Sequence, residues 1–575
     1  MDAARLISLA RGSEQVDLLL TNLRLVDVIS GEIFPTEIAI AGTTIAGIGF
    51  GYGGRKVLDL QNRYVCPGFI DAHVHVESSL LRPCEFARAV VPHGVTTVVS
   101  NPHEIANVCG LEGIYFMLAD GKRSPLTTYV TIPSCVPATN LATSGAELSL
   151  AAIARLQAEP QVIGLGEVMD VHGLLAGDGR VLAELDRFRS QIIDGHCPGL
   201  QGRDLNAYVV AGITSDHECS TVAEAQEKLR AGISLFIREG SVAHNLEALA
   251  PMITPDNERW FSFCTDDRQP IDLQGEGSID HLVRLAVSYG VPPLTAIRLA
   301  TINPAVHFRL SDRGAVTPGR RADLIVFSDL QRLKTELVFQ DGVLRARDGE
   351  CLSAVAGDCA QQDAAWQMQD TVHVNWSRVD WRIPRQGPQM RVIGVVPGQL
   401  STETLMLAPA TAGGQVVADP ERDVAKMMVI ERHRASGRVG RGFVHGLGLQ
   451  RGALASTVAH DHHNLMVVGI DNRSMKTAAR TAAASGGGQA VALGDHILAH
   501  LPLPIAGLMA SASLEDVCFQ VGLLTAAVHT LGSPLPDPFM TMSFLGLEVI
   551  PSLKLTDRGL VDVNSQSFVP LFSAS

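Results

Sequence analysis

The pattern of apolar and polar positions differs between parts of the chain and suggests separate domains. Residues 17–65 contain short runs such as DLLLTNLRLVD and EIAIAGTTIAGIG, which predict strands separated by tight turns. A similar set of runs recurs at residues 321–349. Neither set has enough strands to bury two sheet faces alone. We therefore expect one small β-domain whose two parts, 1–65 and 306–355, pair across the intervening segment.

The intervening segment, residues 66–305, alternates strand-like and helix-like runs. GVTTVVSNP (94–102) and VIGLGEVMD (162–170) are each followed by a run with helical character. This alternation predicts a parallel sheet with crossover helices. About eight such units in this length are typical of a (β/α)8 TIM-type barrel, which has ~250 residues. The predicted fold class is thus α/β, a barrel with a small split β-domain.

Residues 356–575 form a third block of mixed character. VAKMMVIERH and LMVVGID resemble strands, whereas SMKTAARTAAA and LEDVCFQVGLLTAAVHTL resemble helices. This block predicts an additional C-terminal α/β domain.

The charge and hydropathy of the chain argue against nucleic-acid and membrane partners. The net charge of the 575 residues is −14, and a nucleic-acid partner is not expected because such proteins usually present a basic face. The first residues, MDAARLISLARGSEQVD, lack the pattern of a secretory signal. No uninterrupted apolar run reaches the ~18 residues of a membrane span. We expect a cytoplasmic protein with no membrane partner.

The stretch CPGFIDAHVHVESS, residues 66–79, gathers polar groups where a buried strand is predicted to end. Asp71, His73, His75 and Glu77 are spaced two apart, so an extended chain would place them on one face. Two imidazoles on one side of a strand can hold two corners of a cation site. A pair of surface histidines is the alternative, but the apolar run before them favours a buried strand.

Other predicted strands also end in groups that can bind metals. Each group alone could instead have a structural role, for example as a helix cap or as a hydrogen-bonded histidine in a loop. In a TIM-type barrel, however, the C-terminal strand ends meet at one opening, so the set together predicts a metal site. Its further members are Glu167, His196, His217 and Asp266.

These motifs, with their neighbours, resemble a known family. DAHVHVESS, NPHEIANV (101–108), DHECS (216–220) and REGSVAHNL (238–246), followed by GFVHGLGL and AHDHHNLMVVG near the C-terminus, are similar to the bacterial adenine deaminases of the amidohydrolase superfamily. The resemblance spans nearly the whole chain. It implies hydrolysis of adenine to hypoxanthine and ammonia, with two divalent ions per subunit (Mn²⁺, Fe²⁺ or Zn²⁺), in a homo-oligomer, expected to be a dimer, whose partners are adenine and water.

The resemblance also implies a role for each ligand. His73 and His75 would bind the first metal, and His196 and His217 the second. Glu167 would bridge the two, in the place that a carboxylated lysine fills in some relatives.

The same comparison assigns the groups that move protons. Asp266 would contact the first metal and carry a proton from the attacking water to the leaving amine. Glu77 would protonate N1 of the purine or, alternatively, orient a ligand histidine.

Residues after two strands are candidates for binding the purine. His103 and Glu104 lie in NPHEIANV, and Arg238, Glu239 and Ser241 lie in REGSVAHNL. For Arg238, a structural ion pair is an equal alternative. The histidine-rich stretch 460–463 is compatible with an extra metal site, a solvated turn, or a wall or lid of the pocket; the comparison favours the last.

Two other functions remain open at this stage. One is a different amidohydrolase, such as a deacetylase of N-acetyl amino sugars, although a phosphorylated sugar would need a basic pocket. The other is a non-catalytic, metal-stabilised scaffold, which would need no proton shuttle.

Overall fold

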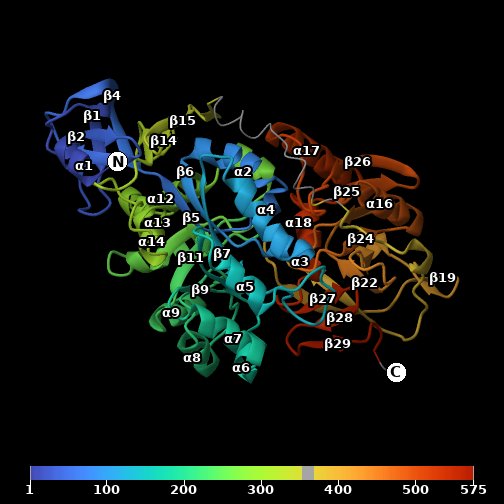
Figure 1. Ribbon diagram of the computed structural model, residues 1–575. Helices are drawn as coiled ribbons and strands as arrows, with labels where there is room; N and C mark the ends of the chain where they lie inside the picture. Colours follow the sequence, from blue (N-terminus) through green and yellow to red (C-terminus); the bar gives the residue numbers. More distant parts are fainter. Residues whose placement is uncertain (1, 353–367, 369, 574–575) are drawn as a thin grey trace.

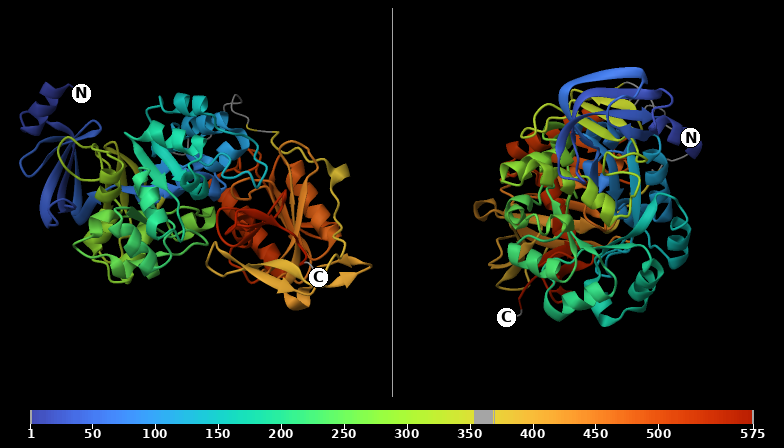
Figure 2. Two further views of the ribbon diagram at one scale, coloured as in Figure 1. Left: turned by 90° about the horizontal axis from the view of Figure 1, so that it is seen from below. Right: turned by 90° about the vertical axis from the view of Figure 1, so that its left-hand side faces the viewer.

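The computed structural model describes residues 2–352, 368 and 370–573. The chain forms a barrel, a small β-domain and a C-terminal domain (Figure 1). The barrel lies between the small β-domain, which contains the N-terminus, and the C-terminal domain (Figure 2). Within the described ranges, every helix is too short or too polar to serve as a membrane span.

The wall of the barrel consists of a five-stranded and a three-stranded parallel sheet. Backbone bonds join them at both seams: Thr214 N–H donates to Ile193 (3.0 Å), and His75 N–H donates to Asp266 (3.1 Å). The strands are β5 (Phe69–Val74), β6 (Val95–Ser100), β7 (Thr127–Pro133), β8 (Val162–Val168), β9 (Ile192–Gly195), β10 (Ser215–Asp216), β11 (Ser234–Arg238) and β12 (Phe261–Cys264). The predicted barrel is therefore confirmed.

Helices cover the outside of this wall, and several begin at side-chain caps that their sequences predict. Ser149 accepts from Ala152 N–H, and Thr221 accepts from Glu224 N–H. The helices are α2 (Pro83–Val90), α3 (His103–Cys109), α4 (Leu111–Gly121), α5 (Leu150–Leu156), α6 (Val171–Ala176), α7 (Gly179–Phe188), α8 (Gly202–Val210), α9 (Val222–Arg230), α10 (Leu246–Leu249), α11 (Pro270–Gly275), α12 (Ile279–Ser288), α13 (Pro293–Leu299) and α14 (Ile302–His307).

The small β-domain is one eight-stranded sheet built from both sides of the barrel segment, with order β16-β15-β14-β13-β4-β1-β2-β3. The two parts join where β13 pairs antiparallel with β4, for example Val326 with Val65. The elements are α1 (Ala3–Ala10), β1 (Val16–Val26), β2 (Ile33–Ala41), β3 (Thr44–Ile48), β4 (Gly54–Pro67), β13 (Leu324–Phe327), β14 (Leu337–Gln340), β15 (Val343–Arg347) and β16 (Glu350–Cys351).

The C-terminal domain contains a second eight-stranded sheet, with order β18-β17-β22-β21-β24-β23-β25-β26. Its strands are β17 (Met390–Val395), β18 (Thr402–Leu407), β21 (Val424–Ile430), β22 (Val439–His445), β23 (Ala453–Ser456), β24 (Leu465–Gly469), β25 (Gly488–Leu493) and β26 (His496–Pro502). Smaller elements are β19 (Thr411–Ala412), β20 (Gln415–Val416), α18 (Pro538–Ser543), β27 (Leu553–Thr556), β28 (Gly559–Asp562) and β29 (Ser567–Val569).

Two helices complete this domain, and one of them reaches the barrel. The small apolar residues of α16 (Asn472–Ala484) pack on the sheet. α17 (Leu514–Thr530) packs between β26 and the barrel helices α2 and α11. The Asp557 carboxylate also accepts bonds from the backbone and the hydroxyl of Thr143 (2.8 and 2.7 Å). The C-terminal domain is thus docked against the mouth of the barrel.

Candidate metal centre

The end of β5 presents two histidines to a carboxylate from β8. Glu167 Oε1 lies 3.0 Å from Nε2 of His73 and 3.0 Å from Nε2 of His75. All three side chains are buried. A cation between them would replace these direct contacts, because imidazole and carboxylate groups are its usual ligands.

The second ring nitrogen of each of these histidines is held by an acceptor. His73 Nδ1 lies 2.9 Å from Asp194 Oδ2, and His75 Nδ1 lies 3.0 Å from the Asn101 carbonyl. Because both acceptors take an N–H from Nδ1, loss of the other proton from either ring would free its lone pair at Nε2, toward Glu167. These partners fix the orientation of both rings, with Nε2 toward Glu167, as a pair of metal ligands would require.

His196 and His217 lie on the other side of Glu167. Glu167 Oε2 is 3.3 Å from His196 Nδ1, and His217 stacks on His73 with ring centroids 4.2 Å apart. Both rings are buried, yet neither nitrogen of His196, nor Nδ1 of His217, finds a hydrogen-bond partner among the described residues. Buried imidazole nitrogens without partners fit a site built to hold a cation.

Asp266 follows β12 and lies beside the first pair of histidines. Its Oδ1 is 3.2 Å from His75 Nε2, and its Oδ2 accepts from Arg238 Nη1 at 2.9 Å. Arg238 also donates to both carboxylate oxygens of Glu218. Because the Arg238 guanidinium holds Oδ2 of Asp266, the other oxygen, Oδ1, faces the histidine–carboxylate cluster.

The electrostatics of the site keep its carboxylates charged. Burial raises the pKa of Glu167, but positive charge on the imidazoles, foremost His75, outweighs burial and holds it well below its usual range. Burial likewise opposes ionisation of Asp266, whereas the bond from His75 and the charge of Arg238 lower its pKa. Both groups are therefore available as anionic ligands at neutral pH.

The structure separates Glu77 from the other members of its predicted strand face. β5 ends at Val74, and Glu77 lies in a single 3-10 turn, η1 (Val76–Ser79), because the chain turns at His75. The expectation that one extended strand carries all four polar residues is therefore wrong. Glu77 Oε1 accepts from Ile105 N–H (3.2 Å) at the start of α3, and burial raises its pKa to about 7.

The predicted purine-binding residues divide into two groups. His103, Glu104 and Arg238 line the central cavity. Glu239 instead accepts from His244 Nδ1 (2.8 Å) and from Leu246 N–H. Ser241 donates to Asp272 and accepts from Gln269 N–H. Glu239 and Ser241 thus stabilise the loop after β11 and are not among the described residues that line the cavity.

The cavity has a floor from the barrel and a roof from the C-terminal domain. Its volume is about 20 Å³, room for about one water molecule. A purine is larger, so the cavity must widen to admit it. The roof consists of Leu400, His460, Asp461, Phe544 and Leu547.

Several site residues escaped the sequence analysis. Asp194 lies two positions before His196 in IIDGHCPG, so strand alternation carried a usable signal for it. Asn101 and Glu218 lie within the motifs NPHEIANV and DHECS, but no role was assigned to them. Leu400, Phe544 and Leu547 are apolar residues in ordinary surroundings, and no local pattern distinguishes them from core residues.

Two family models match separate parts of the chain. Residues 64–345 match the amidohydrolase family, and residues 399–567 match the adenine deaminase C-terminal domain.

Curated relatives match over the whole length. The chain is 43% identical to the adenine deaminase of Kosmotoga olearia, with 100% of this chain and 99% of that protein covered. It is 47% identical to the adenine deaminase of Methanothrix thermoacetophila (99% and 99%). It is 45% identical to adenine deaminase 2 of Carboxydothermus hydrogenoformans (98% and 99%).

Solved structures match a smaller part of the chain. The N-acetyl-D-glucosamine-6-phosphate deacetylase of Mycobacterium smegmatis is 19% identical, with 57% of this chain and 99% of that chain covered and a TM-score of 0.44. A likeness of that size does not bear on activity.

Proposed function

The chain belongs to the adenine deaminase family of amidohydrolases, and we propose that its buried histidine–carboxylate cluster catalyses the hydrolysis of adenine to hypoxanthine and ammonia. The full-length relatives favour this activity over deacetylation of amino sugars and over a scaffold role. The position of the cluster at the C-terminal strand ends supports it, since chemistry in TIM-type barrels occurs there.

The residues fit two divalent ions. His73, His75 and Asp266 would hold one, and His196 and His217 the other, with Glu167 shared. A bound divalent ion lowers the pKa of water to about 7 and so supplies a nucleophile at neutral pH. The donor set suits Mn²⁺, Fe²⁺ or Zn²⁺.

Asp266 would manage the protons of the reaction. Attack of water at C6 breaks the aromaticity of the purine and places electron density on N1. Asp266 takes one proton from the water and delivers it to the amine, which leaves as ammonia. The other proton of the water ends on N1 of hypoxanthine, so the atoms balance. Arg238 holds Asp266 in place through Oδ2.

Glu77 fits a positioning role better than direct contact with the purine. Its carboxylate bonds the start of α3, the helix that carries His103 and Glu104. A carboxylate at that place also interacts favourably with the exposed N–H groups of the helix.

Three further features of the protein are proposals. The family resemblance implies a homodimer, and the sequence pattern favours a cytoplasmic location. The pattern of apolar runs predicts the division of the chain into 1–65, 66–305, 306–355 and 356–575.

One observation carries the proposed function: the two oxygens of Glu167 face different histidine sets. If Glu167 bridges two ions, Glu167→Gln will lower the metal content per subunit and abolish release of ammonia from adenine. Full retention of both ions in this variant would refute the bridging role. Glu184→Gln is a matched control, since that glutamate is buried on α7 and pairs with Arg180.

A further inference from the structure

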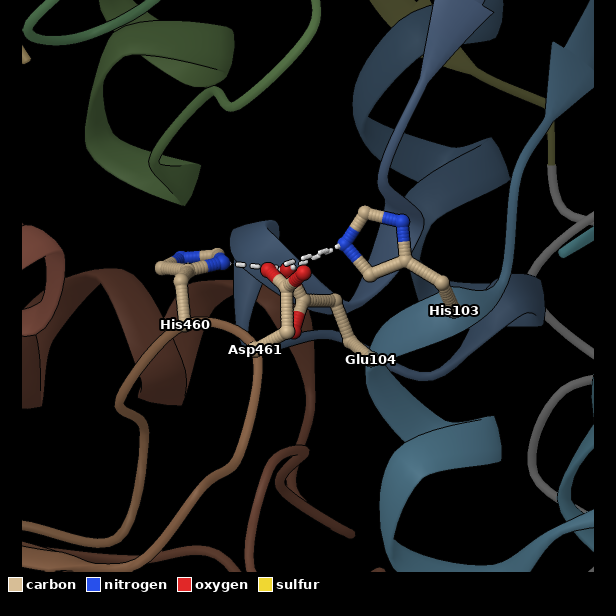
Figure 3. A group of neighbouring side chains, drawn as sticks. All are labelled: His103, Glu104, His460 and Asp461. Atoms are coloured by element: carbon tan, nitrogen blue, oxygen red, sulfur yellow. Dashed lines mark hydrogen bonds and ion pairs between the residues drawn. The ribbon is translucent and has the colours of Figure 1, made fainter. Parts of the chain in front are cut away.

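A second buried cluster lies where the C-terminal domain meets the barrel. His103 and Glu104, at the start of α3, face His460 and Asp461, which lie on a loop between β23 and β24 (Figure 3). All four residues are at most 3% exposed and all line the central cavity. The cluster therefore forms one wall of the space where the substrate must lie.

The contacts of His103 on the barrel side fix the direction of its hydrogen bonds. The Asn101 amide nitrogen donates to Glu167 Oε1 (2.8 Å) and to His103 Nδ1 (3.1 Å). Because His103 Nδ1 accepts, the proton of the neutral ring is on Nε2, which donates to Glu104 Oε1 at 3.0 Å. The only ring N–H of neutral His103 thus donates to Glu104.

The C-terminal domain supplies two more donors to the same carboxylate. His460 Nδ1 donates to Glu104 Oε1, and His463 Nε2 donates to Glu104 Oε2. His463 Nδ1 accepts from Ala459 N–H (3.1 Å), which fixes its tautomer. Glu104 is therefore saturated by three imidazole N–H groups, and it fixes the orientation of His460.

Two atoms of the cluster stay unsatisfied. His460 Nε2 and Asp461 Oδ2 find no hydrogen-bond partner anywhere in the described part of the chain, although both are buried. Leaving a buried polar atom unpaired costs about 1–3 kcal/mol. Such atoms in the wall of a cavity indicate that a ligand supplies their partners.

The neighbouring surface specifies what kind of ligand fits. Phe544 stacks on His460, with ring planes 6° apart and centroids 4.5 Å apart, and Leu547 and Leu400 continue the apolar roof. Flat apolar surfaces beside a few directed polar atoms favour a planar heteroaromatic ligand with polar groups at its edge.

We propose that the C-terminal domain supplies the purine-recognition residues of the active site: Asp461 accepts a hydrogen bond from the imidazole N–H of adenine, and His460, protonated on both nitrogens, donates from Nε2 to a ring nitrogen. This inference rests on the proposed function and names its specificity determinants. It also gives the C-terminal domain a role in the reaction.

A third metal ion at this cluster is the competing interpretation, because its ligand atoms lie within 4.8 Å of one another. The hydrogen-bond directions disfavour it. His103 Nε2 and His460 Nδ1 both carry protons that point to Glu104, and His103 Nδ1 accepts from Asn101. Burial lowers the pKa of His460, but the charge of Glu104 outweighs burial and raises it to about 9, so Nε2 of His460 is protonated as well and cannot bind a cation.

The test uses the metal-loaded full chain and two inhibitors that lack the 6-amino group. Purine keeps the imidazole N–H, whereas thiazolo[5,4-d]pyrimidine has sulfur in place of that N–H and keeps the other ring nitrogens. We expect wild type to bind purine about 10–100-fold more tightly, the value of one hydrogen bond to a charged acceptor. Asp461→Leu should lose most of that preference and raise the KM for adenine by a similar factor, whereas Asp461→Asn, which keeps an acceptor, should retain much of both.

A second variant isolates His460 Nε2. In His460→Asn the amide N–H can replace the Nδ1 donor to Glu104, so only the contact to the ring nitrogen is removed. We expect its KM for adenine to rise about 10-fold. His462→Asn is the matched control, since His462 is buried on the same loop, also has an unpaired Nε2, and is not among the described cavity-lining residues.

Three results would overturn the inference. An equal loss of affinity for both inhibitors in Asp461→Leu would indicate a structural role only. A lower metal content in Asp461→Leu or His460→Asn would indicate a third metal site. Unchanged KM values in both variants would exclude contact with the purine. Failure of the proposed function is distinguishable, because metal-loaded wild type would then release no ammonia from adenine.

Discussion

Arg238 and Asp266 form a buried ion pair that points one carboxylate oxygen at the metal centre. Nη1 of Arg238 lies 2.9 Å from Asp266 Oδ2, and Asp266 Oδ1 is left 3.2 Å from His75 Nε2. The same guanidinium holds Glu218 with two bonds and Asn245 with its Nε. The proton-carrying group of the proposed reaction is thus fixed by a fork that reaches three partners.

Arg238→Lys should slow the reaction without emptying the site. A lysine ammonium has no planar fork, so it cannot hold Glu218 and Asp266 in the same geometry. We expect kcat for adenine to fall about 10–100-fold, with metal content unchanged. Arg268→Lys is the matched control, since Arg268 is equally buried but bonds the Glu239 carbonyl and Glu276. Equal kcat values in the two variants would show that the fork has no role in catalysis.

Asp266→Asn should separate binding from chemistry. The amide keeps the shape of the side chain but cannot take a proton from water, so kcat should fall at least ~1,000-fold, within the range lost when a general base is removed. Metal analysis should still find the ions of wild type. Turnover within tenfold of wild type would mean that another group moves the proton.

Glu548 should make stability depend on pH. Burial is the main cause that raises its pKa to about 8, although it accepts a bond from Thr139 (2.8 Å). Since the folded state holds this proton up to about pH 8 and the unfolded chain releases it near 4.5, stability should fall as pH rises through that interval.

The variant Glu548→Gln removes this titration. Thermal unfolding at pH 5, 7 and 9 should show a smaller decline of Tm than in wild type, with the largest gain at pH 9. The expected gain in unfolding free energy is about 2–4 kcal/mol. Parallel Tm profiles of the two proteins would contradict this account of Glu548.

Lys554 should matter for the roof of the cavity. Its buried ammonium donates to the carbonyls of Leu400 (2.8 Å) and Phe544 (2.9 Å), which are both roof residues. Lys554→Met fills the same space but leaves both carbonyls unpaired, which costs about 1–3 kcal/mol each. We expect a lower Tm and a KM for adenine raised several-fold, with metal content retained. A KM equal to that of wild type would separate Lys554 from substrate binding.

Much of the barrel could be predicted because its signals are local. Alternating apolar runs marked strands such as β8, and DAHVHV marked the end of β5, since strand periodicity and metal-ligand chemistry both show in a few consecutive residues. The fold class, with the small split sheet, is confirmed.

The rest depends on contacts that no short pattern records. Glu77 left the strand face because the chain turns after Val74, and sequence spacing cannot reveal a strand end to within one residue. The roof is formed by residues more than 200 positions away from His75, such as Phe544, and only tertiary packing brings them together. Asp461 was visible as part of a histidine-rich stretch, but its place beside His103 was not.

The proposed reaction requires that the cluster around Glu167 binds metal ions. Metal should be removed with a chelator, and ammonia release from adenine measured as Mn²⁺ is added back in known equivalents per subunit. We predict an inactive metal-free protein whose activity rises until two equivalents are bound. Turnover of adenine by the metal-free protein, or full activity with one equivalent, would contradict the proposed centre.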